Sequence, residues 1–492
     1  MDIRQVIDYI NKHLGYDVDS RIYAYVDLWT DWWRGYHRPF HTYAEDAGNG
    51  RRVERRLYTL RMAKKVCEDW AGILLNEKTS IAPDDAGAKH YLLGEDGDGA
   101  AGKLAQIGFW SHANGLVEKA FATGTGAFLL HVNHIRTAES GSVEPDNKTD
   151  FTLDYLTARH IIPLTVIGNV VTEAAFASEI LQKGKKYVHL EIHELEDMGY
   201  KITNMYFENV NDMLSPTDLP EGLAPVLHTG CPYPWFAIIR PNTVKTIDYA
   251  PGMGQAVFAD AIDQLQGVDL AYNNFCRDFK LGGKKVFYDQ SLLKYEYDEK
   301  TQKQIVITPD DIAQQLFMQI GDGMDADKQR LIQEYNPSLR VAENRDGIQA
   351  ALDYLSFKVG FGTKHYQFNG GSQIVTATQY HGDKQDLIQL ASKHSLVIED
   401  ALSKILHAIL WVACNLMLHT EINPDADIKI SFDDGYIVDP ETQKEIDRQD
   451  VRDGIMTKVE YRVKWYGDSE DEARAALGET ASETDPFGLG GS

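Results

Sequence analysis

The sequence predicts an α+β protein with three parts: a mixed body, a pair of long helices that leaves the body and returns, and one much longer helix. Short runs rich in β-branched and aromatic residues between positions 126 and 240 indicate the sheet of the body. Helical apolar spacing occurs in residues 254–280 and again from Arg345, on either side of a strand-rich insert. A glycine-bearing polar loop within residues 364–380 then precedes a long helical pattern over residues 383–418.

The first 80 residues are predicted to be helical and aromatic. Residues 51–78 carry apolar side chains at spacings of three and four, which predicts one helix with arginines and lysines on its opposite face. A further helix is expected to end near Gly124. The tryptophans Trp29, Trp32 and Trp33 could form a stacking platform for nucleic-acid bases, but packing in a core or a subunit interface is favoured.

Strands are expected in six runs of the central region, which suggest an antiparallel or mixed sheet. The runs are residues 126–135, 151–157, 160–171, 185–196, 200–210 and 234–241.

The segment that follows the sheet reads as a helix going out, a compact insert, and a helix coming back. Apolar residues from Phe258 to Phe279 form one stripe on a predicted helix of about 26 residues, which corresponds to roughly 39 Å. The helix is expected to stop at Gly282 and Gly283, and two strand-like runs with a charged turn between them follow. Helix resumes by Arg345, so the insert occupies about residues 281–343.

The end of the chain is predicted to hold a strand, an acidic stretch and a short helical segment. The strand is residues 427–432 and the acidic stretch is residues 433–450. Ser469 and Glu472 have the spacing of a capping box before a last helix. The tail, residues 479–492, is expected to be disordered.

Composition excludes several classes of protein. The net charge of −25 argues against a simple nucleic-acid coat protein, because such proteins are basic; an acidic protein can still surround DNA and leave it free to move. The most apolar run, residues 405–418, is too short and too polar to span a membrane, and no signal peptide is apparent. The cysteines, which lack metal-ligand spacing, read as reduced thiols of an intracellular protein: Cys67, Cys231, Cys276 and Cys414.

The sequence contains only weak matches to nucleotide-binding, metal-binding or catalytic motifs. Residues 97–104 match a phosphate-loop pattern, but Leu104 stands where Ser or Thr must hold magnesium. His189, Glu191 and His193 alternate along one strand face and could ligate a metal, although a polar strand face is the favoured interpretation. Cys231 has no identifiable catalytic partner. We therefore expect no catalytic residues, no metal and no cofactor.

The ordered set of segments resembles the portal proteins of tailed bacteriophages, in particular the siphophage type. The resemblance rests on "WWRGYHRPFHTY" with "LYTLRMAKKVCEDWAGILLNEK", on "FADAIDQLQGVDLAYNNFCRDFKLGGKKVF", on "IVTATQY" before the long helix, and on "DVRDGIMTKVEYRVKWYGDSEDEARAAL". Together these cover roughly residues 20–477. The carboxy-terminal part is shorter than a large crown or a long barrel would need.

The resemblance implies a ring-forming portal-type fold with an α/β wing, an antiparallel helical stem, a small α/β clip, a long spine helix and a short helical crown. The implied boundaries are residues 1–253 for the amino-terminal wing, 254–280 and 344–360 for the stem, 281–343 for the clip, 361–377 for a tunnel loop, 378–450 for the spine helix and carboxy-terminal wing, and 451–478 for the crown.

The resemblance also implies partners and a location. A ring of usually twelve copies would sit at the portal vertex of the virion capsid, after assembly in the host cytoplasm and without a membrane. Double-stranded DNA would pass through its channel, driven by the terminase large subunit, which supplies the ATP hydrolysis. A head-completion adaptor protein, the major capsid protein and scaffolding proteins would be further partners.

Three groups of site residues follow from this analogy. The tunnel loop would present Asn369, Gly370, Gly371, Ser372 and Gln373. A basic belt at the stem and clip would hold Arg277, Lys280, Lys284 and Lys285, for which ordinary solvated charge is an equally weighted interpretation. A docking turn in the clip would consist of Asp298, Glu299, Lys300, Thr301 and Gln302.

Two other functions stay open at this point. One is a minor capsid or adaptor-like structural protein that assembles without forming a DNA channel. The other is a metal-dependent nucleic-acid-processing enzyme with its metal on His189, Glu191 and His193. Twelvefold rings with a central hole would favour the portal interpretation.

Overall fold

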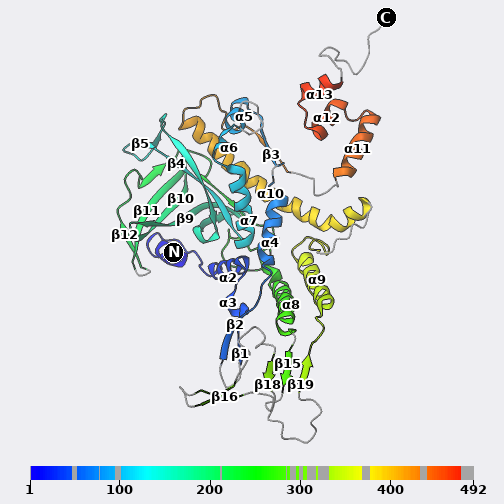
Figure 1. Cartoon of the computed structure of the whole chain (residues 1–492). Helices are drawn as coiled ribbons and strands as arrows, with labels where there is room; N and C mark the ends of the chain where they lie inside the picture. Colours follow the sequence, from blue (N-terminus) through cyan, green and yellow to red (C-terminus); the bar gives the residue numbers. More distant parts are fainter. Residues whose placement is uncertain are drawn as a thin grey trace.

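The computed structural model confirms a mixed α+β fold, in which a helix pair projects from a body of helices and antiparallel sheets (Figure 1). The structure describes residues 2–46, 52–76, 78–94, 101–210, 213–283, 285–288, 295–298, 303–306, 317–319, 332–367, 377–432 and 440–477.

The body contains two principal antiparallel sheets. The larger has the order β12-β11-β10-β9-β8, with β13 paired to β11, and the smaller has the order β14-β4-β7. The larger sheet comprises β8 (Ile161–Ile167), β9 (Val170–Gln182), β10 (Lys185–Glu196), β11 (Gly199–Val210), β12 (Met213–Thr217) and β13 (Val226–His228). The smaller comprises β4 (Gly126–Asn133), β7 (Asp150–Thr157) and β14 (Phe236–Ile239).

All six expected runs form strands, but β9 was mostly missed. Its sequence "VVTEAAFASEILQ" includes three alanines, which have weak strand propensity. These alanines are fully buried because both faces of the sheet are covered there: Ala175 and Ala177 pack in the main core and Ala174 in a second apolar cluster. Two short pairs complete the body's sheets: β5 (Arg136–Thr137) with β6 (Val143–Glu144), and β3 (Ser80–Pro83) with β20 (Ile428–Ser431).

Helices pack on these sheets and share one apolar core with them. They are α1 (Ile3–His13), α2 (Ile22–Arg34), α4 (Met62–Leu74), α5 (Ala86–Leu93), α6 (Lys103–Gln106), α7 (Phe109–Thr123) and α10 (Ala377–Asn415). Helix α7 ends at Thr123, beside Gly124 as expected, because Gly124 has a left-handed φ of +82°. Glycine is required there, since a Cβ would lie 2.8 Å from the Gln255 backbone.

Helix α10 is 39 residues long and changes direction along its length (Figure 1). The Ser392 hydroxyl donates to the carbonyl of Ile388, and the side-chain amide of Asn242 donates to the carbonyl of Lys393. Side chains that bond helix carbonyls in this way bend helices.

The single helix predicted for residues 51–78 is wrong. The chain forms a hairpin of β1 (Thr42–Asp46) and β2 (Arg52–Arg56) after a short α3 (Arg38–His41), and helix α4 begins only at Met62. Arg61, which precedes it, has a φ of +56°, so the helix cannot extend further back. The 3–4 spacing of Leu57 and Leu60 was therefore coincidental.

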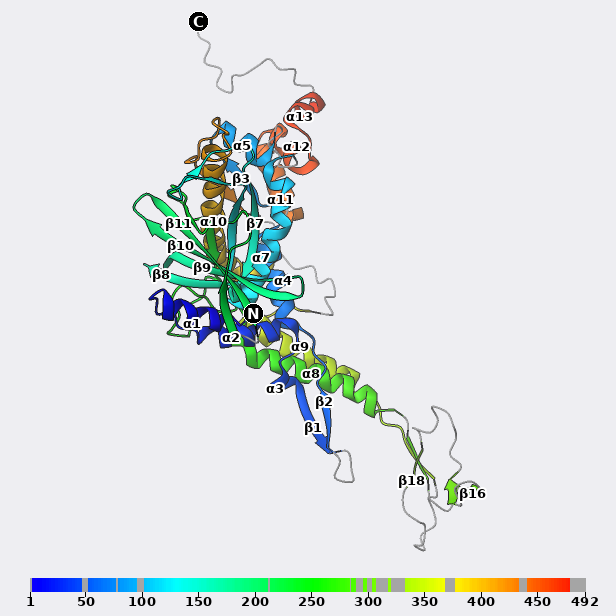
Figure 2. The same ribbon diagram turned by 90° about the vertical axis from the view of Figure 1, so that its left-hand side faces the viewer.

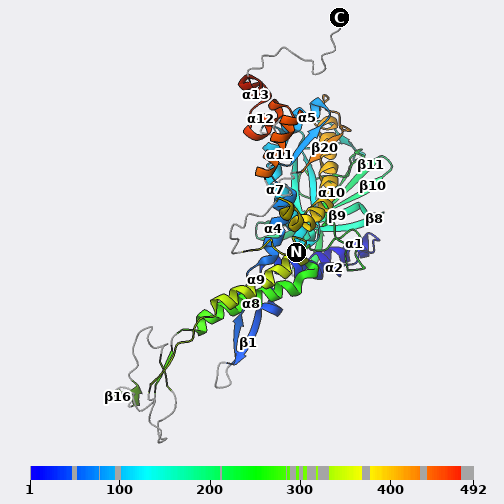
Figure 3. The ribbon, with the colours of Figure 1, turned by 90° about the vertical axis from the view of Figure 1, so that its right-hand side faces the viewer.

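The projecting part, which we call the arm, consists of α8 (Ile262–Leu281), α9 (Val341–Lys358) and the strands beyond them (Figures 2 and 3). Helix α8 ends as expected beside Gly282 but starts later than residue 254. Phe258 is not helical; it is fully buried in the body core, and a 3₁₀ turn (Ala259–Ala261) leads into α8.

The strands that the structure describes at the far end of the arm form two small groups. One has the order β18-β15-β19 and the other is the antiparallel pair β16-β17. Their bounds are β15 (Lys285–Tyr288), β16 (Tyr295–Asp298), β17 (Lys303–Val306), β18 (Phe317–Gln319) and β19 (Ile332–Tyr335).

Three helices end the described chain: α11 (Pro440–Asp453), α12 (Lys458–Tyr466) and α13 (Glu470–Leu477). Helix α11 lies largely within the stretch interpreted only as acidic. The capping box is confirmed, since the Ser469 hydroxyl accepts from the Glu472 amide and the Glu472 carboxylate accepts from the Ser469 amide. The expected tail lies outside the described residues.

Candidate nucleic-acid interface

Asp269 fastens the β1-β2 hairpin to the arm helix α8. Its carboxylate accepts hydrogen bonds from His41 Nε2 (3.1 Å), the Thr59 hydroxyl (3.0 Å) and the Leu60 amide (2.7 Å). Both Asp269 and His41 are buried. One turn further along α8, the side chain of Asn273 accepts from the Tyr58 amide. The buried bonds fix where the hairpin lies on the helix.

This placement creates a basic crevice of about 290 Å³ between the hairpin and α8. Four cationic side chains line it, namely Arg55 and Arg56 of the hairpin with Arg277 and Lys280 of α8. Glu45 supplies the one carboxylate among the lining residues. It accepts from Arg55 Nε at 2.9 Å and from an Arg277 terminal nitrogen at 3.4 Å. The crevice is therefore locally positive on a chain of net charge −25.

The structure places the predicted basic belt only in part. Arg277 and Lys280 lie together at the end of α8, but Arg277 shares Glu45 with Arg55. Lys285 begins β15, where only the backbone is described, and Lys284 lies outside the described residues. The role of this group stays a prediction.

Sequence reasoning missed Arg55 and Arg56. The signal was present as "RRVERR", but these arginines were assigned to the solvent face of a helix. Arg56 instead lies over the ring of Tyr36, at 4.4 Å. Only the hairpin brings this segment, more than 200 residues earlier in the chain, next to α8.

The two arm helices are joined near their outer ends by Asp278. Arg340 donates to both of its carboxylate oxygens, and the Asn344 amide donates at 2.7 Å. The hydrogen bond from Arg340, followed by that from Asn344, lowers the pKa of Asp278. The pairing therefore stays ionised over the neutral pH range.

The predicted tunnel-loop residues, Asn369 to Gln373, lie outside the described residues, but the chain that leads to them is fixed to the body. Phe361 stacks on Trp70 with 4.7 Å between ring centroids, and His365 lies 3.5 Å from the carboxylate of Asp69. Burial alone would raise the pKa of Asp69, but hydrogen bonds from His365 and Lys65 hold it below its usual value.

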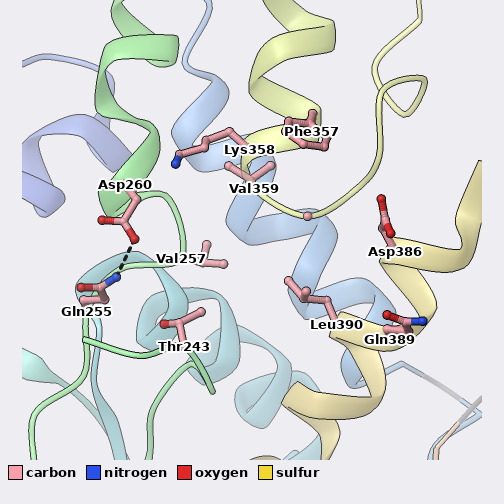
Figure 4. A pocket seen from close by; sticks show the side chains of 11 residues that line it. Thr243, Gln255, Val257, Asp260, Phe357, Lys358, Val359, Asp386, Gln389 and Leu390 are labelled. Carbon is pink, nitrogen blue, oxygen red and sulfur yellow. Dashed lines mark hydrogen bonds between the residues drawn. The ribbon is translucent and has the colours of Figure 1, made fainter. Parts of the chain in front are cut away.

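A pocket of about 300 Å³ lies where the arm joins the body (Figure 4). Gln255 and Asp260, which share a hydrogen bond of 3.0 Å, contribute to it from the segment and 3₁₀ turn that precede α8. Phe357 comes from the end of α9, and Asp386 from α10. The pocket marks the place where the segment before α8 and the end of α9 meet α10.

The predicted docking turn is bounded by paired strands. Asp298 ends β16 and pairs with Lys303 of β17. Glu299, Lys300, Thr301 and Gln302 lie outside the described residues. The turn therefore connects a hairpin, and its docking role stays a prediction.

The candidate metal ligands do not converge. Glu191 accepts from His193 at 2.7 Å, and its other oxygen lies 3.3 Å from His131, whereas His189 bonds Asn204 at 2.8 Å. Within the described parts of the chain, no group of three or more His, Cys, Asp or Glu side chains could hold a metal ion. Glu191 and His193 therefore pair with each other on β10, whereas His189 bonds across to β11.

The other candidate chemical residues are buried or paired with neighbouring side chains. Lys103 of the phosphate-loop pattern pairs with Asp150 at 2.8 Å, and Leu104 is fully buried. Burial raises the pKa of Cys231 to about 12, which keeps this thiol protonated. Trp29 and Trp32 are 2 % exposed, as expected for core residues rather than a base-stacking platform.

Comparison with known proteins does not identify a family for this chain. No protein-family model matches the chain, and no curated protein matches it. One matching solved structure is described as "Neck of native GTA particle computed with C12 symmetry". It is 10% identical with a TM-score of 0.33 and covers 85% of this chain and 90% of that chain. A TM-score this low does not establish a shared fold.

Among the described residues, no helix combines the length and the apolar character that a membrane span requires.

Proposed function

We propose that the chain is a portal subunit of a tailed-phage-like particle, in which a ring of twelve copies surrounds the channel for double-stranded DNA. The observation that carries this proposal is the arm: two helices leave the body, bear a small strand-rich unit at their far end, and return to a very long helix. Heterologous contacts between identical copies form a ring when the rotation from one copy to the next closes. An arm along the ring axis would form a stem, and the distal strands would form its clip.

The basic crevice and the loop supply two ways to contact DNA. Cations repeated around a ring would make positive belts inside an acidic particle, which steadies phosphates without gripping them. The expected tunnel loop, residues 361–377, begins where Phe361 stacks on Trp70 and His365 lies beside Asp69. A polar loop held there would act on the duplex by steric and hydrogen-bond contact.

Negative-stain images of the purified chain test the ring. We expect rings with a central hole, and we expect their formation to depend on salt, because each copy carries a net charge of −25. Discs or filaments without a hole would favour the minor capsid or adaptor-like alternative.

Replacing Gly370 and Gly371 with valine tests the loop. Valine restricts the backbone, so we expect normal rings but reduced DNA packaging by the terminase. Wild-type packaging by this variant would show that the flexibility of the loop is dispensable.

Replacing residues 298–302 tests the docking turn. We expect rings to form but binding of the terminase or the head-completion adaptor to fall. Loss of rings would instead make the turn an element of the subunit interface. The ring's place at the capsid portal vertex, among capsid and scaffolding proteins, follows from the same proposal.

A further inference from the structure

A second cationic crevice lies in the body, away from the arm. It has a volume of about 480 Å³, within the size range of ligand sites, and lies between the β8-β9 turn, the segment 240–254 and helix α10. Arg240, Lys245 and Lys393 line it, with Asp248 as its one acidic lining residue. None of the three cations forms an ion pair with a described carboxylate.

The two inner cations are held in place by neutral groups. Arg240 donates to the backbone carbonyl of Asn169 at 2.8 Å and to its side-chain oxygen at 3.4 Å. Lys245 donates to the carbonyls of Tyr249 and Ala250, both at 2.6 Å. Each cation keeps further N–H donors beyond these bonds, since guanidinium has five and ammonium three.

The charge of this pair is poorly compensated. Burial lowers the pKa of Arg240, with Asp400 opposing it. Burial and then Arg240 lower the pKa of Lys245, with Asp248 opposing them. Asp400 is already paired with Lys404 at 2.6 Å. Fixed, partly buried donors that lack an anionic partner are the arrangement that binds an anion.

We propose that this crevice is an oxyanion-binding site, in which Arg240 and Lys245 hold a phosphate or carboxylate group and Lys393 closes its outer edge. The oxyanion has two possible sources, free inorganic phosphate or an acidic side chain of a second copy of the chain. The first source does not depend on ring formation, so its test stands apart from that of the proposed function.

The experiment begins with thermal unfolding of the full-length chain in sodium phosphate and in sodium chloride at matched ionic strength. A free-oxyanion site predicts a saturable rise of the unfolding midpoint in phosphate alone, because a ligand that binds the folded state stabilises it. Lys245→Met and Arg240→Gln should weaken the apparent phosphate affinity about tenfold or more. Lys89→Gln, which removes an exposed charge on α5, is the matched control and should respond like the wild type.

Arg240 and Lys245 are partly buried, so their variants could misfold. Lys393→Gln tests the site without this risk, because Lys393 is exposed. It should fold normally and still reduce the phosphate response. A response that persists unchanged in Lys393→Gln, Lys245→Met and Arg240→Gln would overturn the site.

A second experiment uses zero-length carbodiimide crosslinking of a mixture of isotopically light and heavy chains. A link from Lys393 or Lys245 to a carboxylate of the other isotope, without a phosphate response, assigns the oxyanion to a second copy. Absence of both the phosphate response and the mixed-isotope link would overturn the proposal.

Discussion

Different interactions stabilise the body and the attachment of the hairpin to the arm. In the body, Trp70 is fully buried, stacks on Phe361 and meets His394 edge-on with 5.0 Å between ring centroids. The arm helix α8 is instead attached to the hairpin through the directional hydrogen bonds of Asp269. Apolar packing spreads over many contacts, whereas a few hydrogen bonds can be lost at one residue. A single change at a buried body residue should therefore destabilise the body as a whole, whereas a single change at Asp269 should only detach the hairpin.

The largest expected effect comes from Trp70→Ala in the body. Removing a fully buried tryptophan should lower the free energy of unfolding by about 3–5 kcal/mol. Urea unfolding followed by circular dichroism measures this loss. Trp110→Ala, at a half-buried position on α7, should cost clearly less, and equal losses would contradict the packing account.

The ion pair of buried Glu191 and half-buried His131 should make the body's stability depend on pH. Although burial favours the protonated acid, the charge of His131 and the hydrogen bond from His193 lower the pKa of Glu191 from 4.5 to about 2. Burial likewise opposes the charge of His131, but Glu191 and Asp154 raise its pKa above 6.5. The stability from Glu191 is thus complete above pH 4.5 and lost as the pH falls toward 2. That from His131 is complete below pH 6.5 and lost at higher pH.

The difference in unfolding free energy between wild type and Glu191→Gln should then be largest between pH 4.5 and 6.5. It should be on the order of 3 kcal/mol there and shrink on both sides. Denaturant unfolding at a series of pH values measures it. Glu139→Gln, at an exposed turn, should show no such profile. A flat difference for Glu191→Gln would disprove the ionised pair.

Asp269→Ala tests the attachment of the hairpin to the arm. It leaves three donors without an acceptor, but the hairpin can detach and expose them to water, which limits the cost to about 2–3 kcal/mol. Hydrogen exchange should accelerate in residues 42–60 and stay slow in α7. Asp263→Ala, at an exposed position on the same helix, is the control. Uniformly faster exchange throughout the body would show that the two regions are not separable.

The smallest effect on stability is expected in the basic crevice. Arg56→Gln combined with Lys280→Gln should change the free energy of unfolding by no more than about 0.5 kcal/mol. The dependence of duplex-DNA binding on salt should weaken, by about 0.9 in the log–log slope for each phosphate contact removed. Fluorescence anisotropy over a sodium chloride series measures the slope. An unchanged slope would mean that these cations do not face DNA, and Lys12→Gln with Lys89→Gln controls for net charge.

The sequence was sufficient for elements whose pattern is local. The β10 and β11 strands and the end of α7 at Gly124 follow from alternation and from a left-handed cap. It failed where tertiary contacts override propensity. The alanines of β9 form a strand because they fit between neighbouring strands, and Leu57 and Leu60 mimic a helix that the hairpin replaces.

The candidate site could likewise be predicted from the sequence only where its residues are close together in the chain. Arg277 and Lys280 are one turn apart on a helix and could be grouped from the sequence. Arg55 and Arg56 reach them only through the bonds of Asp269 to residues 41–60, and no periodicity reports a contact at such a separation. Arg240 and Lys245 likewise become a site only once α10 lies against the segment between them.

Electron cryomicroscopy of the purified full-length chain tests the central claim most directly. We expect closed rings of twelve copies with a central hole, with the arms along the ring axis and residues 369–373 facing the hole. A monomer at high concentration without rings, or a ring that carries residues 369–373 on its outer rim, would contradict the proposal.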